Sequence, residues 1–322
     1  MSVRILGKEQ EYYKQACNIQ GYRMNKTEEQ VFLENYDINK YERPSVAADM
    51  AVFTIMQDDT QPDNYRRLPE KKLKILLIKR GGSPYKDMWA LPGGFLKKGE
   101  TIYETARREL KEETGADHAY LELCNVFSEH GRDPRGWIIS QAFMALISSD
   151  ISDEKSSLKV GSDAKEAGWF DVRLEKTEEK KYKKNGNIVC DIVYTLTLTK
   201  EVVLSAVIEE HKVYKDYHKI VEYRIIQSEG LAFDHAKIIT CIINKLRKNV
   251  ETDAKIVFDL MPEYFTLTDL QKTFEIISDK ELLKPNFRRK IAEYVEETDM
   301  TMMNGGHRPS KLFKRNINAF YK

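Results

Sequence analysis

The sequence of 322 residues predicts an α+β sandwich followed by a second, mainly helical module. Strand-like apolar segments stand on both sides of one strongly capped helix, and this order of elements is typical of an α+β sandwich. From about residue 230 the pattern changes to helical periodicity and ends in a short basic segment. The length is sufficient for two domains with substantial cores.

Segments rich in Val, Ala, Ile and Leu predict the strands of the sandwich. They are Ser45–Met56, Leu73–Lys79, Tyr120–Phe127 and Ile138–Ile147, with a short further strand at Gly168–Phe170. The polar residues 1–43 form an N-terminal extension, in which Thr27–Tyr36 is a candidate helix. We expect this extension to pack on the domain that follows, and its sequence shows no functional motif.

One helix is predicted inside the sandwich, from Thr101 to Gly115. Thr101 and Glu104 have the spacing of a capping box, in which each side chain binds the backbone N–H of the other residue. Gly115 suits the left-handed position that ends a helix. The buried face is predicted from apolar residues at four-residue spacing, which are Ile102, Ala106 and Leu110.

Three acidic side chains gather on this helix. Glu109 and Glu113 are one turn apart, Glu112 lies beside them, and Arg108 adjoins the group. Like charges at this spacing destabilise a helix, so a bound cation would explain the cluster. Oxygen ligands without Cys or His favour Mg²⁺ or Mn²⁺, and the turn at Gly94 lets a backbone carbonyl approach as a further ligand. A solvated acidic helix face is the alternative interpretation.

The spacing of the whole stretch resembles the complete Nudix box, GX5EX7REUXEEXGU. Gly94, Glu100 and the run Arg108–Ala116 occupy its fixed positions, with Ala116 in place of a larger aliphatic residue. The resemblance implies a Nudix α/β/α sandwich with a mixed sheet, and hydrolysis of a nucleoside diphosphate linked to another group. Arg108 would orient the glutamates. The metal ligands that the resemblance implies are the Gly94 carbonyl, Glu109, Glu112 and Glu113.

Candidate substrate contacts lie near the box. The loop 128–136 contains Arg132 and Arg135 on either side of an aspartate, and guanidinium groups suit bidentate binding of phosphate. A local Arg–Asp pair in a surface turn is the alternative. The Asp-Pro-Arg-Gly sequence of this loop resembles the ADP-ribose branch of Nudix proteins, which supports both arginines as substrate contacts. Arg80, Trp89 and Phe95 are further candidates, with core packing or a solvated strand end as the alternative.

Glu166 is the candidate general base. A carboxylate on the loop 162–169 would activate water, and related enzymes place a base in this general region. A surface acid before a strand is the alternative interpretation.

Residues 175–227 predict an additional antiparallel β-segment. Asn185-Gly186 is a hairpin signal, and the segments at 188–199, 202–207 and 223–227 alternate as strands do. We assign this segment to the Nudix domain, whose predicted bounds are 44–228, with a role in packing or dimerisation.

The C-terminal module, residues 229–322, predicts a winged helix-turn-helix. A helix to about Lys248 is followed by one that starts near Thr266 and one over Lys284–Val295, which together suggest a helix-turn-helix. The last of these begins with proline and carries basic residues where a recognition helix meets a groove. Residues 305–315 predict the wing. The candidate DNA contacts are Arg288, Arg289, Lys290, Arg308, Lys311 and Lys314. A helical domain used only for packing is the alternative.

Together the two modules resemble the NrtR-like proteins, in which an ADP-ribose-binding Nudix domain is joined to a winged helix. The first function that this implies is a Mg²⁺-dependent pyrophosphohydrolase, cleaving ADP-ribose to AMP and ribose 5-phosphate. The alternative is a transcriptional regulator that senses ADP-ribose or a related ligand and binds double-stranded DNA as a homodimer.

The composition limits the other partners. A net charge of +1 and a pI near 7.6 give no overall field that would attract nucleic acid or a membrane surface. No run approaches the roughly 20 apolar residues that span a bilayer, and the N-terminus lacks a signal core, so we expect no membrane partner. The four cysteines, Cys17, Cys124, Cys190 and Cys241, show no metal-type spacing and are typical of free thiols in the cytoplasm.

Overall fold

The computed structural model describes residues 26–57, 70–116, 119–148, 150, 164–303 and 309–320. The chain divides into two compact units, Met1–Arg43 and Pro44–Lys322. The described part of the first unit contains α2, Glu28–Asn35, and the 3-10 turn η1, Ile38–Lys40. The side chains of Thr27 and Gln30 cap α2 reciprocally, which confirms the helix predicted there.

The second unit is built on one mixed sheet. Its order is β10-β9-β8-β7-β2-β1-β6-β5, with β3 beside β2 and β4 beside β1. The strands are β1 Ser45–Gln57, β2 Lys71–Arg80, β3 Trp89–Ala90, β4 Gly93–Phe95, β5 Tyr120–Phe127, β6 Ile138–Leu146, β7 Ala164–Lys184, β8 Asn187–Thr199, β9 Val203–Lys215 and β10 His218–Glu229. β1 and β6 are parallel, whereas β1 and β2 are antiparallel, so the predicted mixed sheet is confirmed.

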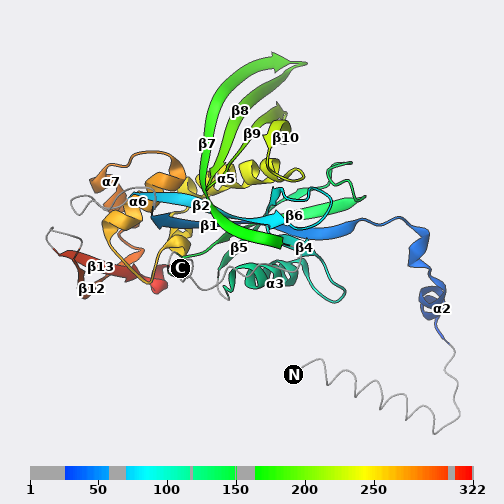
Figure 1. The fold of residues 1–322 in the computed structure, drawn as a ribbon, viewed down its shortest axis with the longest axis horizontal. Helices are drawn as coiled ribbons and strands as arrows, with labels where there is room; N and C mark the ends of the chain where they lie inside the picture. The colour runs from blue at the N-terminus through cyan, green and yellow to red at the C-terminus, as the bar shows by residue number, and fades with distance from the viewer. Residues whose placement is uncertain are drawn as a thin grey trace, which may run out of the picture. The chain divides into compact units, whose positions relative to one another are not determined.

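Two helices cover opposite faces of this sheet (Figure 1). Because side chains of a strand alternate between faces, Met50 and Val52 of β1 pack with Leu110 of α3, Ile102–Thr114. Phe53 points to the other face and belongs to the cluster that contains Ile239 of α5, His235–Thr252. The sheet between α3 and α5 is the predicted α/β/α sandwich, which is confirmed.

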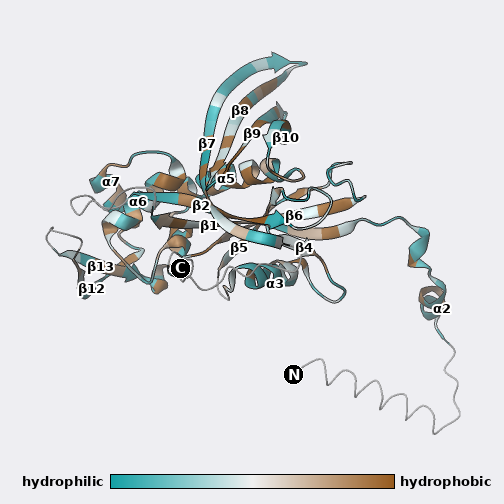
Figure 2. Cartoon of the chain, viewed as in Figure 1, coloured by the Kyte–Doolittle hydropathy of each residue, from teal (hydrophilic) through white to brown (hydrophobic). Residues whose placement is uncertain are grey.

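Strand β7 is much longer than the sequence indicated. A short strand was predicted at Gly168–Phe170, but β7 continues for 21 residues to Lys184. Its outer half is charged and exposed, so it has no apolar alternation, and it is held by backbone pairing with β8. Figure 2 shows this hydrophilic outer part in teal. The hairpin signal is confirmed, because Asn185 and Gly186 both have positive φ, at 51° and 79°.

The C-terminal elements form a winged helix. They are η2 Ala254–Leu260, β11 Tyr264–Phe265, α6 Leu267–Ser278, α7 Lys284–Ile291, β12 Val295–Met302, β13 Ser310–Arg315 and α8 Ile317–Phe320. β11, β13 and β12 make a small antiparallel sheet. The helix predicted over Lys284–Val295 is too long, because the chain leaves α7 after Ile291 and pairs with β13 from Val295 onward. In the described part of the chain, no helix is long and apolar enough to cross a membrane.

Candidate functional site

Helix α3 presents the acidic residues of the box. The Thr101 backbone N–H donates to Glu104 Oε2 at 2.7 Å, and the Thr101 hydroxyl accepts from the Glu104 N–H, so the predicted capping box is confirmed. Capping fixes the start of the helix and therefore which side chains face the sheet. The Glu109 side chain is 12% exposed, Glu113 is buried, and Glu112 is exposed.

Arg108 links the acids of the box. Its guanidinium donates to Glu100 Oε1 at 2.9 Å and to Glu109 Oε1 at 2.6 Å, and it lies 3.6 Å from Glu112 Oε2. The hydrogen bond from Arg108 lowers the pKa of Glu100 to about 2, and the same pairing raises the pKa of Arg108. The Arg108 guanidinium thus holds the Glu100 carboxylate in the ionised state and also contacts two further acids of the box.

The glycine turn lies directly against these acids. β4 pairs with β1 at Ala48 and Asp49, which places Gly94 beside α3. A Cβ atom at Gly94 would lie 1.9 Å from Glu109 Oε1, so only glycine permits this approach. The Gly94 backbone therefore lies directly beside the Glu109 carboxylate.

These residues line a cleft of about 410 Å³. Its acidic side chains are Asp49, Glu109, Glu112, Glu113 and Asp133, and its cationic side chains include Arg80, Arg108, Arg132 and Arg135. Phe95, Phe233 and His235 complete the part of the lining that matters for a nucleotide. A cleft that contains both carboxylates and guanidinium groups suits a metal-bound diphosphate.

The donor set fits a hard divalent cation. Carboxylate and carbonyl oxygens converge on one cleft, and the Gly94 position is shaped to the Glu109 carboxylate. As the side chains stand, no three metal-ligating groups among the described residues are gathered closely enough to hold an ion. Arg108 contacts one oxygen of Glu109 and one of Glu112, so the second oxygen of each carboxylate is outside these contacts.

Two of the predicted substrate-binding arginines meet one aromatic ring. The guanidinium carbon of Arg135 lies 5.1 Å from the ring centre of Phe95 and 5.2 Å from that of Phe233. Arg80 lies 4.9 Å from the same Phe233 ring and donates to the Pro84 carbonyl at 2.7 Å. Arg135 is also paired with an aspartate of its own loop. The cleft therefore has a cationic and aromatic wall that suits a nucleotide.

The Arg132 side chain lines the cleft but is only 6% exposed. Its guanidinium donates to both carboxylate oxygens of Asp234, at 2.7 and 3.0 Å, and lies 3.7 Å from Asp49. Burial alone would lower the pKa of Arg132, but the hydrogen bonds and charge of Asp234 outweigh it and raise that pKa. Arg132 is therefore charged and, in this structure, held by the first turn of α5.

Two predicted site residues are placed away from the cleft. Trp89 is buried, with its ring 4.7 Å from that of Phe170, and is not among the residues that line the cleft. Glu166 stands on β7 rather than on a loop, with its carboxylate 3.3 Å from Lys200 and 3.8 Å from Lys79. Neither position supports the substrate or general-base role predicted for it.

Other residues of the cleft were not predicted. Asp49 is the one acidic residue in the otherwise largely apolar strand β1, and this isolated position could have indicated a functional role from the sequence alone. Phe233, Asp234 and His235 precede or open α5 and also line or border the cleft. His235 is buried, and its Nδ1 accepts the Leu91 N–H at 2.8 Å. Burial lowers the pKa of His235, so the ring is neutral.

The predicted DNA contacts have unequal surroundings. Arg288 and Arg289 are exposed on α7, whereas the Lys290 ammonium donates to the Val250 carbonyl at the end of α5. On the wing, Lys311 pairs with Glu297 and Lys314 pairs with Glu296 of β12. Arg308 lies outside the described residues. The exposed cations of α7 are therefore the strongest candidates for phosphate contact.

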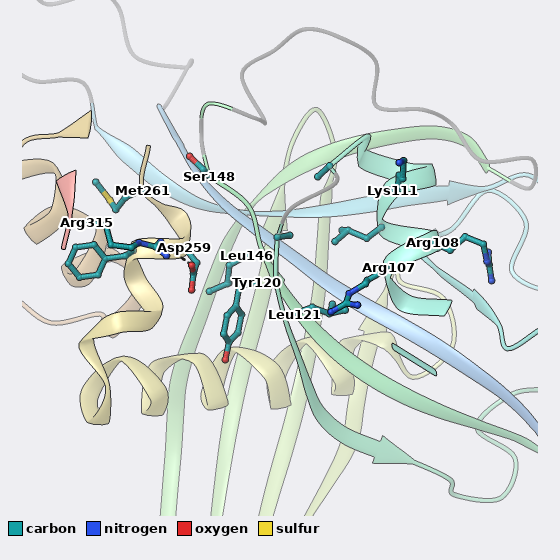
Figure 3. A pocket seen from close by; sticks show the side chains of 14 residues that line it. Arg107, Arg108, Lys111, Tyr120, Leu121, Leu146, Ser148, Asp259, Met261 and Arg315 are labelled. Atoms are coloured by element: carbon teal, nitrogen blue, oxygen red, sulfur yellow. Dashed lines mark hydrogen bonds and ion pairs between the residues drawn. The ribbon is translucent and has the colours of Figure 1, made fainter. Parts of the chain in front are cut away.

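A second hollow, of about 790 Å³, lies between α3 and the winged helix (Figure 3). Arg107 and Lys111 come from α3, and Arg315 comes from β13. Figure 3 shows Arg315 beside Asp259, with which it pairs at 3.0 Å. This hollow is larger than the cleft but lacks the Gly94 turn and the acids Glu109 and Glu113, so the chemistry of the box belongs to the smaller cleft.

The fold and the cleft together define a Nudix-type sandwich joined to a DNA-binding type of winged helix. The NUDIX domain model matches residues 66–191, and the model of the NrtR DNA-binding winged helix domain matches residues 257–314. The chain belongs to the Nudix superfamily and, within it, to the NrtR-like proteins that carry a C-terminal winged helix.

Similar proteins fall into both expected functional classes. The chain is 29% identical over 296 residues to the ADPR responsive transcriptional repressor NtrR of Acinetobacter baylyi, across 91% of this chain and 90% of that protein. It is 39% identical over 160 residues to an ADP-ribose pyrophosphatase of Methanocaldococcus jannaschii, across 49% of this chain and 79% of that protein. A MutT/nudix family protein from Enterococcus faecalis has a similar structure, with a TM-score of 0.61, 26% identity and coverage of 96% and 98%.

Proposed function

We propose that this protein is a transcriptional regulator that senses ADP-ribose, or a related nucleoside diphosphate derivative, in the Nudix cleft and binds DNA through its winged helix. The observation that carries the proposal is the joining, in one chain, of a diphosphate-type cleft to a winged helix with exposed Arg288 and Arg289. The similarity to an ADPR responsive repressor over nine-tenths of both chains supports this role. We include in the proposal a cytoplasmic homodimer, because helix-turn-helix proteins commonly read paired half-sites as dimers.

The ligand part of the proposal follows from charge and shape. A diphosphate needs cations that bind two oxygens at once, and Arg80, Arg132 and Arg135 lie around the cleft. An adenine or ribose needs an apolar face, and Phe95 and Phe233 supply two. The domain bounds predicted from the sequence, 44–228 and 229–322, remain part of this proposal.

The test measures DNA binding by the full chain. Fluorescence anisotropy with a duplex from upstream of its own gene, at low salt, is expected to show binding that changes when ADP-ribose is added. Replacing both Arg288 and Arg289 with Ala removes two candidate phosphate contacts and should weaken binding about tenfold or more. Lys183→Ala removes an exposed cation from β7 and serves as the charge control. Absence of binding at low salt, with and without ADP-ribose, would contradict the proposal.

Hydrolysis of the same ligand is the second candidate function. The observation that favours it is the complete box, whose Gly94, Glu109, Glu112 and Glu113 all line the cleft. In this role Glu109 and Glu113, with the Gly94 carbonyl, would hold Mg²⁺, and Glu112 would assist. A bound Mg²⁺ supplies Lewis acidity toward the diphosphate. Arg108 would position the glutamates, and the arginines of the cleft would stabilise charge that develops on the phosphates.

Product analysis tests hydrolysis. Wild-type protein with Mg²⁺ and ADP-ribose is expected to yield AMP and ribose 5-phosphate by mass spectrometry, and Glu109→Gln or Glu113→Gln should lower the rate by at least about 100-fold. Glu104→Gln is the matched control, because it makes the same change on the same helix outside the cleft and Gln still completes a capping box. Equal rates for wild type and both cleft variants would exclude the assignment.

A further inference from the structure

The turn that opens α5 is part of the wall of the cleft. Gly230 accepts the Trp89 N–H at 2.9 Å, and the Ala232 N–H donates to the Trp89 carbonyl at 2.8 Å. His235 then accepts the Leu91 N–H through Nδ1. Residues 230–235 are thus fastened to the strand that runs directly into the Gly93-Gly94 turn. Whatever fills the cleft meets the start of α5.

Side chains of this turn face the position expected for a ligand. Phe233 lines the cleft and lies close to the guanidinium groups of Arg80 and Arg135. Phe233 also has φ of 52°, a left-handed conformation that a bulky side chain rarely adopts. The turn holds this aromatic ring in the wall of the cleft at a conformational cost, which is typical of functional positions.

Asp234 holds an arginine that a diphosphate would also bind. Its carboxylate accepts two hydrogen bonds from Arg132 and lies 3.4 Å from the Lys237 ammonium, which in turn lies 3.0 Å from Glu129. The Arg132 and Asp234 side chains are only 6% and 10% exposed. Asp234 holds the edge of Arg132 that carries Nε and Nη2, so a phosphate that binds this same edge competes with Asp234.

The other end of α5 is joined to the winged helix. Leu246 and Val250 of α5 belong to the same buried cluster as Leu270 and Phe274 of α6. The Val250 carbonyl accepts a hydrogen bond from the Lys290 ammonium of α7. Figure 1 shows α5, in yellow, ending beside α6. A helix of 18 residues is about 27 Å long, so α5 reaches from the cleft to the DNA-binding helices as one rigid element.

We infer that the Arg132–Asp234 pair is a switch: a diphosphate ligand takes Arg132 from Asp234, the first turn of α5 loses this contact with the loop 128–136, and α5 carries that change to α6 and α7. The inference rests on the proposed ligand-sensing function and adds its route of regulation. Lys237 remains with Asp234 when Arg132 leaves, so the carboxylate is not left without a cation. Ligand binding therefore moves the buried arginine from Asp234 to the ligand, without leaving a buried charge unpaired.

Hydrogen exchange of the full chain in EDTA, with and without saturating ADP-ribose, tests the inference. In wild type we expect altered exchange in two places: peptides of α3 and the loop 128–136, and peptides of α5 and α6. Altered exchange in the first place alone would overturn the switch and leave ligand sensing intact. No change in either place would overturn both. This measurement needs no variant, so it stands whether or not a variant folds.

Asp234→Asn separates competition from simple support. If Asp234 competes with the ligand, the variant should bind ADP-ribose several-fold more tightly, and the response of DNA affinity to ligand should fall from about fivefold or more to less than about twofold. If Asp234 only holds Arg132 in place, binding should weaken, which would overturn the inference. Glu122→Gln is the control, because it removes the ion pair between Lys245 of α5 and β5, at 2.8 Å, away from the cleft. This control should keep the wild-type response.

Discussion

Replacing Gly93 or Gly94 with alanine is predicted to affect the protein in different ways. A Cβ atom at Gly93 would lie 2.3 Å from the Ala48 carbonyl oxygen and 3.0 Å from the Asp49 Cα, both in the backbone of β1. At Gly94 the nearest atoms are the carboxylate oxygens and carbon of Glu109, the far end of a flexible side chain. The first clash has to move a central strand, whereas the second is relieved by a rotation.

The sizes of the two effects follow from what must move. Overpacking against backbone costs about 1–3 kcal/mol and occasionally more, and Gly93→Ala also strains the β4–β1 pairing, so we expect a loss of about 3 kcal/mol. Gly94→Ala makes Glu109 retreat and weakens its 2.6 Å hydrogen bond with Arg108. Arg108 keeps its bonds to Glu100, so we expect a loss of only about 1–2 kcal/mol.

Gly94→Ala, which should cost the smaller amount of stability, should cause a large loss of hydrolysis. Folded Gly94→Ala protein has Glu109 displaced from the cleft, so Mg²⁺-dependent hydrolysis should fall by at least about 100-fold while most of the stability remains. Gly82→Ala is the control, because nothing lies within 4 Å of the added atom. Urea unfolding followed by tryptophan fluorescence, together with the product assay, measures both quantities. Equal destabilisation by Gly93→Ala and Gly94→Ala, or a Gly94→Ala protein with wild-type hydrolysis, would refute the reasoning.

Three further predictions concern the pH dependence of stability, the buried Glu210 of β9 and the winged helix. The hydrogen bond from the guanidinium beside it lowers the pKa of Glu100 from 4.5 to about 2, so this carboxylate stabilises the fold above pH 4.5 and the effect disappears as the pH falls toward 2. Urea unfolding at several pH values should show the stability advantage of wild type over Glu100→Gln shrinking across that window. Glu210 is buried and accepts hydrogen bonds from two tyrosines while pairing with a lysine, so Glu210→Ala should cost about 3–5 kcal/mol in urea unfolding, and Glu210→Gln less. Arg288→Ala and Arg289→Ala should each lower the slope of log affinity for DNA against log salt by about one, whereas Lys290→Ala should mainly lower thermal stability, because its ammonium caps the end of α5.

Each of these has a contrary outcome. A constant difference between wild type and Glu100→Gln at all pH values would show that Arg108 does not stabilise the ionised carboxylate. Glu210→Ala protein as stable as wild type would mean that water satisfies the tyrosines and the lysine. A larger change in salt slope for Lys290→Ala than for Arg288→Ala would place the DNA on the other face of α7.

Local signals were enough to predict half of the site. The capping box, the spacing of Glu109 and Glu113 on one helix, and the glycine turn are all determined by neighbours in sequence, and the structure has each where the pattern indicated. The hairpin at Asn185-Gly186 was predictable for the same reason, because a two-residue turn needs residues that tolerate positive φ.

The other half of the site depends on contacts between distant segments. His235 and Leu91 are joined by a hydrogen bond although they are 144 residues apart, and Arg132 and Asp234 are 102 residues apart. No periodicity links such positions. Glu166 shows the converse error: a polar segment suggested a loop, but backbone pairing with β2 makes it part of β7. Trp89 was predicted as a site residue because it is close to the box in sequence, yet alternation along β3 directs its side chain into the core.

The position of α5 would let one chain combine the two proposed roles, sensor and enzyme. α5 covers one face of the sheet and so belongs to the sandwich by packing, while its end is buried against α6 and so belongs equally to the winged helix. Glu109 and Glu113 belong to α3, which covers the opposite face of the sheet. Changes in Glu109 or Glu113 should therefore affect how long a ligand survives, and changes in Arg132 or Asp234 should affect what the ligand does to DNA binding. Hydrolysis would end the signal, and the ion pair between Arg132 and Asp234 would then form again.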